Sequence, residues 1–319
     1  MTPGPPTRTV ALGGGRTLTL DDVGDPAGAP VVFLHGTPDS RLARHPDDGL
    51  AAAAGVRLVA LDRPGYGGST PLAAGTWSPD WPGAWAGDVA TALDAIDVER
   101  CAVLAWSGGA LGGLALAAHG SPVAERGREP AAGPLAGRVA ALGIVAGLVP
   151  RQAYEDPEVR AAGEARLGTI DLADVMPPGG LGDEVAPMLA PWPCDEPLAA
   201  EHQASQRTPA DALELASVPG GAEAMAAGLA EGVRLGLAGV AADVEAQARP
   251  LAVDLSRARC PARLWYGEAD QVTPVAFGRW YAAHLPDARL AVVEGAGHYL
   301  ALTRWSQLLA EMAALVEGT

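Results

Sequence analysis

Short apolar runs alternate with helical stretches along most of this chain, and this alternation constrains the fold more than any other feature. The runs are rich in Val, Leu and Ala, so we interpret them as buried strands. They lie at residues 31–34, 57–61, 101–105, 138–146, 263–266 and 289–293. Because repeated βα units place helices on both faces of a parallel sheet, the pattern predicts an α/β fold with a mostly parallel sheet flanked by helices. Two further runs around Gly13-Gly14-Gly15 predict a hairpin near the start of the chain.

The alternation stops between residues 149 and 250, where we find only helical stretches broken by Pro and Gly. Since it resumes afterwards, we interpret this block as an insertion and not as a second domain in tandem. The sequence therefore predicts a core formed by residues 1–148 and 251–319 and a helical cap formed by residues 149–250. The block holds 17 Asp and Glu against 6 Arg, a net charge of −11 out of −16 for the chain. This acidity fits a solvated helical surface, or a cap that disfavours anionic substrates.

Charge and missing residue types exclude several classes of function. A net charge of −16 and a pI near 4.7 oppose binding to nucleic acid or to an anionic membrane surface. The chain has no Lys, which excludes a Walker A loop and a lysine Schiff base. Its three Cys form no CxxC pair and its six His form no HExxH motif, so we predict neither a metal nor a cofactor. We find no apolar leader and no unbroken apolar run of about 18 residues, so we expect a cytoplasmic protein without a membrane span.

A candidate nucleophile stands where the strand at 101–105 gives way to a helix of small residues, in the sequence Ala105-Trp106-Ser107-Gly108-Gly109. A Ser on such a sharp turn exposes its hydroxyl, and the residues two places before and after it must be small because strand and helix crowd together. Ala105 and Gly109 meet this requirement. Ser107 is therefore the candidate nucleophile, and it needs an adjacent base.

A base and an orienting carboxylate follow the last two predicted strands. His298 lies among small residues directly after the strand at 289–293. Asp270 follows the strand at 263–266 and is the preferred carboxylate, with Glu268 as the alternative. Such a carboxylate fixes the tautomer of the base and stabilises its protonated form. The chain order Ser, Asp, His is typical of enzymes whose nucleophile stands on this kind of turn.

Two backbone N–H groups are the candidate donors to an oxyanion. The N–H of Gly108 follows the nucleophile at a helix N-terminus, where the helix dipole favours negative charge. The N–H of Thr37 lies in the sequence His35-Gly36-Thr37-Pro38, after the strand at 31–34. One such donor is worth about 3 kcal/mol of the activation barrier. Trp106 and His35 are candidates for contact with the substrate, although Trp106 could equally pack in the core.

Together these motifs resemble those of the capped α/β-hydrolases, which include esterases, epoxide hydrolases, dehalogenases and cofactor-free haloperoxidases. The resemblance covers residues of about 8–148 and 251–319 and rests on the motifs at 35–38, 61–69, 105–109, 267–270 and 297–298. It implies a helical lid between the sixth and seventh strands, and a structural role for His35 and Asp62-Arg63. Dehalogenases and epoxide hydrolases carry an Asp nucleophile where this chain has Ser107, which argues against both activities. The chain also lacks the HGGPG and G-x-S-W-G motifs of proline iminopeptidases.

The residues predict a serine hydrolase that cleaves an ester, lactone or thioester of a small molecule through an acyl-enzyme. Two alternatives stay open. One is an acyltransferase or cyclase that uses the same triad in natural-product tailoring, and the other is a non-catalytic ligand-binding protein on the same fold. The sequence identifies neither the substrate nor the oligomeric state, and it offers no function for the loop at 121–134.

Overall fold

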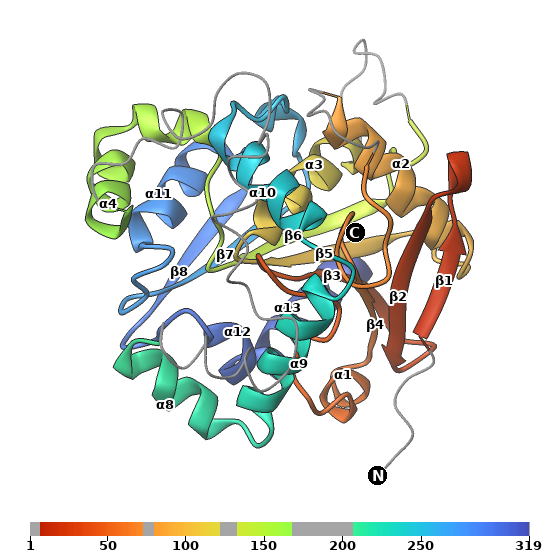
Figure 1. The fold of residues 1–319 in the computed structure, drawn as a ribbon, viewed down its shortest axis with the longest axis horizontal. Coiled ribbons are helices and arrows are strands. Elements are labelled where there is room, and N and C mark those ends of the chain that lie inside the picture. The colour runs from red at the N-terminus through yellow and green to blue at the C-terminus, as the bar shows by residue number, and fades with distance from the viewer. Residues whose placement is uncertain (1–6, 73–79, 122–132, 168–206, 319) are drawn as a thin grey trace.

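An eight-stranded sheet forms the centre of the protein in a computed structural model, which describes residues 7–72, 80–121, 133–167 and 207–318 (Figure 1). The strands are β1 (Thr7–Ala11), β2 (Thr17–Gly24), β3 (Ala29–Leu34), β4 (Val56–Leu61), β5 (Cys101–Trp106), β6 (Val139–Val145), β7 (Ala262–Gly267) and β8 (Ala288–Val293). Their order across the sheet is β1-β2-β4-β3-β5-β6-β7-β8.

The pairing of these strands confirms the predicted fold class. β1 and β2 form the predicted hairpin, and β2 also pairs antiparallel with β4. All the other pairs in the sheet are parallel. The protein therefore has the mostly parallel sheet that the alternation of strands and helices predicts.

Helices cover both faces of this sheet. One face carries α2 (Trp81–Asp94), α3 (Gly109–Gly120) and α11 (Val275–His284), and the other carries α1 (Gly49–Ala53) and α13 (Trp305–Glu317). Side chains along β3 alternate between the two cores: Val32 and Leu34 join the first, and Val31 and Phe33 join the second. Because both faces of the strand are covered, all four positions are apolar, which explains the continuous apolar run in the sequence.

Residues 149–250, called the β6–β7 segment from here on, connect two adjacent parallel strands. The described part of the segment contains only helices: η2 (Arg151–Glu155), α4 (Pro157–Leu167), α8 (Pro209–Ser217), α9 (Gly221–Val233) and α10 (Ala238–Ala248). Residues 168–206 of the segment and most of the loop at 121–134 lie outside the described residues. Figure 1 shows α8 beside α12 (Leu300–Thr303), so the segment reaches the loop that follows β8.

No single helix among the described residues is long and apolar enough to cross a membrane. The helices α9 and α10 pass such a test only as a pair, and the pair is bent by 92°.

The carboxyl ends of the central strands lie along one edge of the sheet. Leu34, the last residue of β3, lies opposite Ala105 of β5. Gly267, the last residue of β7, lies opposite Val293, the last residue of β8. The loops after β3, β5, β7 and β8 therefore leave the sheet at the same edge, and these loops carry the candidate site residues.

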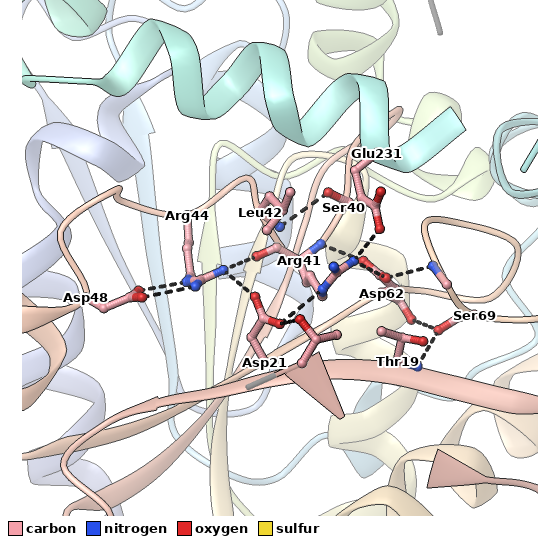
Figure 2. Close-up of polar contacts among 12 residues, drawn as sticks. Thr19, Asp21, Ser40, Arg41, Leu42, Arg44, Asp48, Asp62, Ser69 and Glu231 are labelled. Carbon is pink, nitrogen blue, oxygen red and sulfur yellow. Dashed lines mark hydrogen bonds and ion pairs between the residues drawn. The ribbon is translucent and has the colours of Figure 1, made fainter. Parts of the chain in front are cut away.

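A buried ionic network fixes the loop after β3 (Figure 2). Arg41 Nε donates to Asp21 Oδ1 of β2 at 3.1 Å, and Arg41 Nη1 donates to Asp62 Oδ2 at 2.8 Å. The same Nη1 donates to Glu231 Oε1 of α9 at 2.7 Å. Arg44 Nη1 donates to the second oxygen of Asp21 at 2.9 Å. A helix of the β6–β7 segment thus joins a network whose other members lie on β2 and on the loops after β3 and β4.

Candidate active site

Ser107 stands on the turn between β5 and α3 in the left-handed backbone conformation, with a φ of 53°. This conformation is strained for a residue with a Cβ, so its neighbours must hold it. The Ser107 N–H donates to the Val145 carbonyl at 3.0 Å, and the Ser107 carbonyl accepts the Leu148 N–H at 3.1 Å. A Cβ at Gly109 would lie 2.6 Å from the Leu34 carbonyl oxygen, so strand and helix do crowd the turn. The turn has the features of a nucleophile elbow.

Three predicted side chains meet at this turn. Ser107 Oγ lies 3.0 Å from His298 Nε2, and His298 Nδ1 lies 2.9 Å from Asp270 Oδ2. All three residues are buried, with 6%, 8% and 5% of the surface of Ser107, His298 and Asp270 exposed. A hydroxyl, an imidazole and a carboxylate in this order can move a proton from the hydroxyl to the imidazole.

The Asp270 carboxylate has several donors besides the imidazole. Its Oδ1 accepts the N–H groups of Val272 at 2.7 Å and Thr273 at 2.9 Å, and its Oδ2 accepts the Thr273 hydroxyl at 2.6 Å. Burial alone would raise the pKa of Asp270, but the charge of His298 and the hydrogen bonds from His298 and Thr273 outweigh burial and lower it. The carboxylate therefore stays ionised beside the imidazole. Glu268, the alternative carboxylate, is exposed and accepts the Gly295 N–H at 3.2 Å.

The two candidate oxyanion donors lie next to each other. A Cβ at Gly108 would clash with Thr37 Oγ1 and would lie 3.2 Å from Thr37 N, so the approach requires Gly. Gly36 lies against the nucleophile, since a Cβ there would be 3.1 Å from the Ser107 Cβ. Arg63 Nη2 holds this loop through the Gly36 carbonyl at 2.7 Å and through Thr37 Oγ1 at 3.0 Å. The backbones of Thr37 and Gly108 thus lie close together beside the turn that carries Ser107.

A carboxylate of α10 reaches the same loop. Asp243 accepts hydrogen bonds from Arg63 Nη1 and Tyr66 Oη, both at 2.6 Å, and from the Thr37 hydroxyl. Burial, followed by the charge of Asp243, raises the pKa of Tyr66 well above its usual value, so its hydroxyl remains a donor. The loop after β3 is therefore held by Arg63 from the core and by Asp243 from the β6–β7 segment.

His35 and Trp106, the two residues expected to contact the substrate, instead bind backbone groups. His35 has no exposed surface; its Nδ1 lies 2.8 Å from the Gly36 carbonyl oxygen, and its Nε2 accepts the Arg63 N–H at 3.0 Å. Burial, followed by the Arg63 charge, lowers the pKa of His35 well below its usual value, so the ring is neutral. The structure corrects the expectation of substrate contact for His35, because the ring is fully enclosed. Trp106 Nε1 donates to the His298 carbonyl at 3.1 Å. It thus supports residues 294–299, which connect β8 to α12 and are called the histidine loop from here on.

Sequence reasoning missed three polar residues at this site. Thr273 donates to Asp270, and Asp211 and Glu214 of α8 accept backbone N–H groups from the loop that carries His298. The segment 208–211 has the spacing of a capping box, and this box starts α8 in the structure. That signal could have located the helix, but not its contact with the histidine loop.

Within the described ranges, no group of three or more His, Cys, Asp or Glu side chains could hold a metal ion. Cys101 and Cys260 are buried free thiols, and Cys194 lies outside the described residues.

Comparisons of the sequence and of the fold with known proteins find a family and several similar structures. A family model described as "Alpha/beta hydrolase family" matches residues 31–312. The solved structure of an alpha/beta hydrolase fold protein from Nakamurella multipartita is 25% identical, with a TM-score of 0.63 over 98% of this chain and 100% of that chain. The esterase RhEst1 from Rhodococcus sp. ECU1013 is 20% identical, with a TM-score of 0.61 over 98% of each chain. A bromoperoxidase from Bacillus anthracis is 17% identical, with a TM-score of 0.57 over 98% of this chain and 100% of that chain.

A curated relative matches over a short stretch. The pimeloyl-[acyl-carrier protein] methyl ester esterase of Chromobacterium violaceum is 49% identical over 55 residues, which are 17% of this chain and 20% of that protein. The match thus spans a fifth of the length of this relative.

Proposed function

Because the chain belongs to the alpha/beta hydrolase family, as its motifs predict, we propose that it is a serine hydrolase that cleaves an ester, lactone or thioester bond of a small molecule. The observation that carries the proposal is the pair of contacts that joins Ser107 Oγ to His298 Nε2 at 3.0 Å and His298 Nδ1 to Asp270 Oδ2 at 2.9 Å. Two similar proteins named above, one by fold and one by a short stretch of sequence, carry the name esterase, which supports a carboxylic ester as the substrate.

In the proposed reaction, His298 takes the proton of Ser107 Oγ as this oxygen attacks the carbonyl carbon of the substrate. The π electrons of the carbonyl move to its oxygen, and the N–H groups of Thr37 and Gly108 donate to the oxyanion. Collapse of the intermediate expels the alcohol or thiol, which takes the proton from His298, and leaves the acyl group on Ser107. Water then attacks the acyl-enzyme, with His298 as the base that takes its proton. Collapse of this second intermediate releases the acid and expels Ser107 Oγ, which takes the proton back from His298. Asp270 stabilises the imidazolium that forms in each half-reaction.

We also propose that the β6–β7 segment is a cap over this site and that residues 1–148 and 251–319 form the core. Its helices contact three loops at the edge of the sheet where the strands end: α8 binds the histidine loop, α9 binds Arg41, and α10 binds Thr37. In open α/β sheets this edge is where ligands bind. A cytoplasmic location, and the absence of nucleic-acid and membrane partners, stay predictions from the sequence.

The variant Ser107→Ala tests the nucleophile. With a short p-nitrophenyl ester as substrate, we expect kcat to fall by at least about 10³-fold, because the attacking oxygen is gone. A fluorophosphonate probe should label Ser107 in the wild type. Ser306→Ala, a change of the same kind at an exposed position of α13, is the matched control and should keep the wild-type rate. Wild-type turnover by Ser107→Ala would refute the assignment, and a folded wild type that resists labelling would favour the ligand-binding alternative.

Product analysis separates hydrolysis from acyl transfer. The acyl-enzyme can be attacked by water or by an added alcohol or amine, and the same triad serves both reactions. Release of the free acid as the main product, with an acceptor present, supports hydrolysis. An acceptor that takes up most of the acyl group would instead identify an acyltransferase.

A further inference from the structure

The loop that carries His298 is held by carboxylates of the β6–β7 segment. Asp211 Oδ1 accepts the His298 N–H at 2.7 Å. Glu214 Oε1 accepts the Gly297 N–H at 3.0 Å, and Glu214 Oε2 accepts the Tyr299 N–H at 2.9 Å. Three successive backbone donors, centred on the candidate base, are thus bound by two side chains of one helix.

The local geometry makes this contact rigid. Asp211 and Glu214 are three positions apart on α8, so they project from the same face of the helix. The amides that they bind come from three residues directly before the first residue of α12, and buried backbone N–H groups of this kind need an acceptor from elsewhere in the chain. Asp211 uses its other oxygen to accept the Thr208 N–H at 2.9 Å in the capping box of α8, which fixes the orientation of its carboxylate.

Gly297 shows how closely α8 approaches the loop. A Cβ at this position would clash with Asp211 Oδ1 and would lie 3.1 Å from Glu214 Oε2. Asp211 and Glu214 have only 3% and 8% of their surface exposed, so water has little access to these hydrogen bonds. The His298 carbonyl is bound as well, by Trp106 Nε1 at 3.1 Å. Both backbone polar groups of His298 are therefore held.

We propose that Asp211 and Glu214 are positioning residues for His298: by binding the amides of residues 297–299, α8 sets the distance between the imidazole and Ser107 Oγ. The inference rests on the proposed function, since it requires His298 to act as the base. It adds that the segment proposed to cover the substrate also orients the base. Without α8, the rest of the chain would not hold the His298 imidazole at its distance from Ser107 Oγ.

Because Glu214 is ionisable, the proposal also predicts that the contact between α8 and the histidine loop depends on pH. Burial raises the pKa of Glu214 to about 7, although the hydrogen bonds from Gly297 and Tyr299 oppose the shift. Each oxygen of Glu214 serves one amide, so protonation turns one acceptor into a hydroxyl and weakens that bond. As the pH falls through about 7, the histidine loop should therefore lose part of its support.

The other ionisable groups near Glu214 come from three directions. Asp211 lies on α8 itself, and Asp270 lies on the loop between β7 and α11; both raise the pKa of Glu214 further. His298 and Tyr299 lie on the loop that α8 binds. Arg207, just before α8, hydrogen-bonds the Tyr299 side chain.

The variant Glu214→Gln tests the proposal, because it keeps the shape of the side chain but removes one acceptor and the titration. With a p-nitrophenyl ester we expect kcat to fall about tenfold while KM changes less than about twofold, since the change displaces the base and not the groups that bind the ester. In the wild type, kcat/KM should carry a proton-linked step from Glu214 near pH 7, and this step should be absent from the variant. Glu223→Gln, at an exposed position of α9, is the matched control and should keep the wild-type kcat and the step near pH 7.

An unchanged kcat in Glu214→Gln, with the step near pH 7 still present, would overturn the proposal. A rise in KM alone would overturn it too, because that result places Glu214 against the substrate and not behind the base. If the variant does not fold, hydrogen exchange of the wild type decides. Protection of amides 297–299, corrected for the intrinsic rate, should fall as Glu214 is protonated, and constant protection refutes the role.

Failure of the proposed function would look different. The wild type would then show neither ester turnover nor labelling of Ser107. Failure of the positioning role leaves the wild type active and labelled, with kcat and the pH profile insensitive to Glu214→Gln.

Discussion

Two neighbouring helices of the β6–β7 segment dock on the core through a glutamate, but the glutamates meet different partners. Glu231 of α9 accepts from Arg41 at 2.7 Å (Figure 2). It also accepts from Arg234 at 2.8 Å. Burial would raise the pKa of Glu231, but hydrogen bonds from the two arginines outweigh it and lower the pKa. Glu214 of α8 binds neutral backbone amides, and burial raises its pKa to about 7. The α9 contact is therefore an ion pair at neutral pH, whereas the carboxylate of the α8 contact takes up a proton at about pH 7.

This difference shows that the partner of a buried carboxylate, and not the helix or segment that carries it, determines the direction in which its pKa shifts. An arginine offsets the cost of burying the charge, whereas amide dipoles offset it only in part. The α9 contact should thus be strong and insensitive to pH near neutrality. The α8 contact, next to the candidate base, should be weaker and adjustable.

The largest effect that tests this comparison is expected for Arg41→Met. The change leaves Asp21, Asp62 and Glu231 without their shared cation in a buried site. We expect the free energy of unfolding to fall by about 3–5 kcal/mol, measured by urea denaturation. Arg8→Met is the matched control, because Arg8 is half-exposed and its partner Asp22 keeps Arg57 at 2.8 Å. We expect a loss of less than about 0.5 kcal/mol. A loss for Arg41→Met as small as that of the control would mean that the α9 contact is not held by charge.

A smaller, pH-dependent effect is expected for Glu214→Gln. The pKa of Glu214 is raised from 4.5 to about 7 by burial in the folded protein, so the folded state binds this proton more tightly than the unfolded chain does. The contribution of this proton to the free energy of unfolding is therefore fully present below pH 4.5 and is lost as the pH rises through about 7. Between these limits we expect the wild type to lose about 1–3 kcal/mol relative to the variant, measured by urea denaturation at a series of pH values. Parallel curves for the two proteins would contradict the assignment of this titration.

The smallest effect is expected for Glu231→Gln. Arg41 keeps Asp21 and Asp62 in this variant, and the amide oxygen of Gln can still accept one hydrogen bond. We expect a loss of about 1 kcal/mol that stays the same between about pH 6 and about pH 8. A loss that varies across this range would remove the distinction between the α8 and α9 contacts.

The fold and the candidate triad could be predicted because each follows from a local pattern. Strands buried on both faces are continuous apolar runs, the Ser107 turn demands small neighbours, and the His298 and Asp270 loops each follow a predicted strand. Once the strands are parallel, their ends lie at one edge, and the three side chains meet there.

The contacts of the β6–β7 segment could not be predicted in this way. Glu214 and Tyr299 are 85 positions apart, and a backbone N–H leaves no mark in the sequence that would pair it with an acid. The acidity of residues 149–250 suggested a solvated surface or an effect on anionic substrates. Part of that charge instead faces the core, through the carboxylates of Asp211, Glu214, Glu231 and Asp243. The expected contact of His35 with the substrate was wrong for a related reason. Its position after a strand did not show that the ring turns inward, where its centroid lies 5.0 Å from that of the Tyr66 ring.

The contact of α8 with the histidine loop also limits how this chain could be recombined with its relatives. A chimera that received a foreign block between β6 and β7 would keep Ser107, Asp270 and His298, yet the amides of 297–299 would lose their acceptors. A donor whose corresponding helix bears two acids three positions apart could restore all three. Grafting designed to alter selectivity should therefore match that pair of acids before it matches the shape of the pocket.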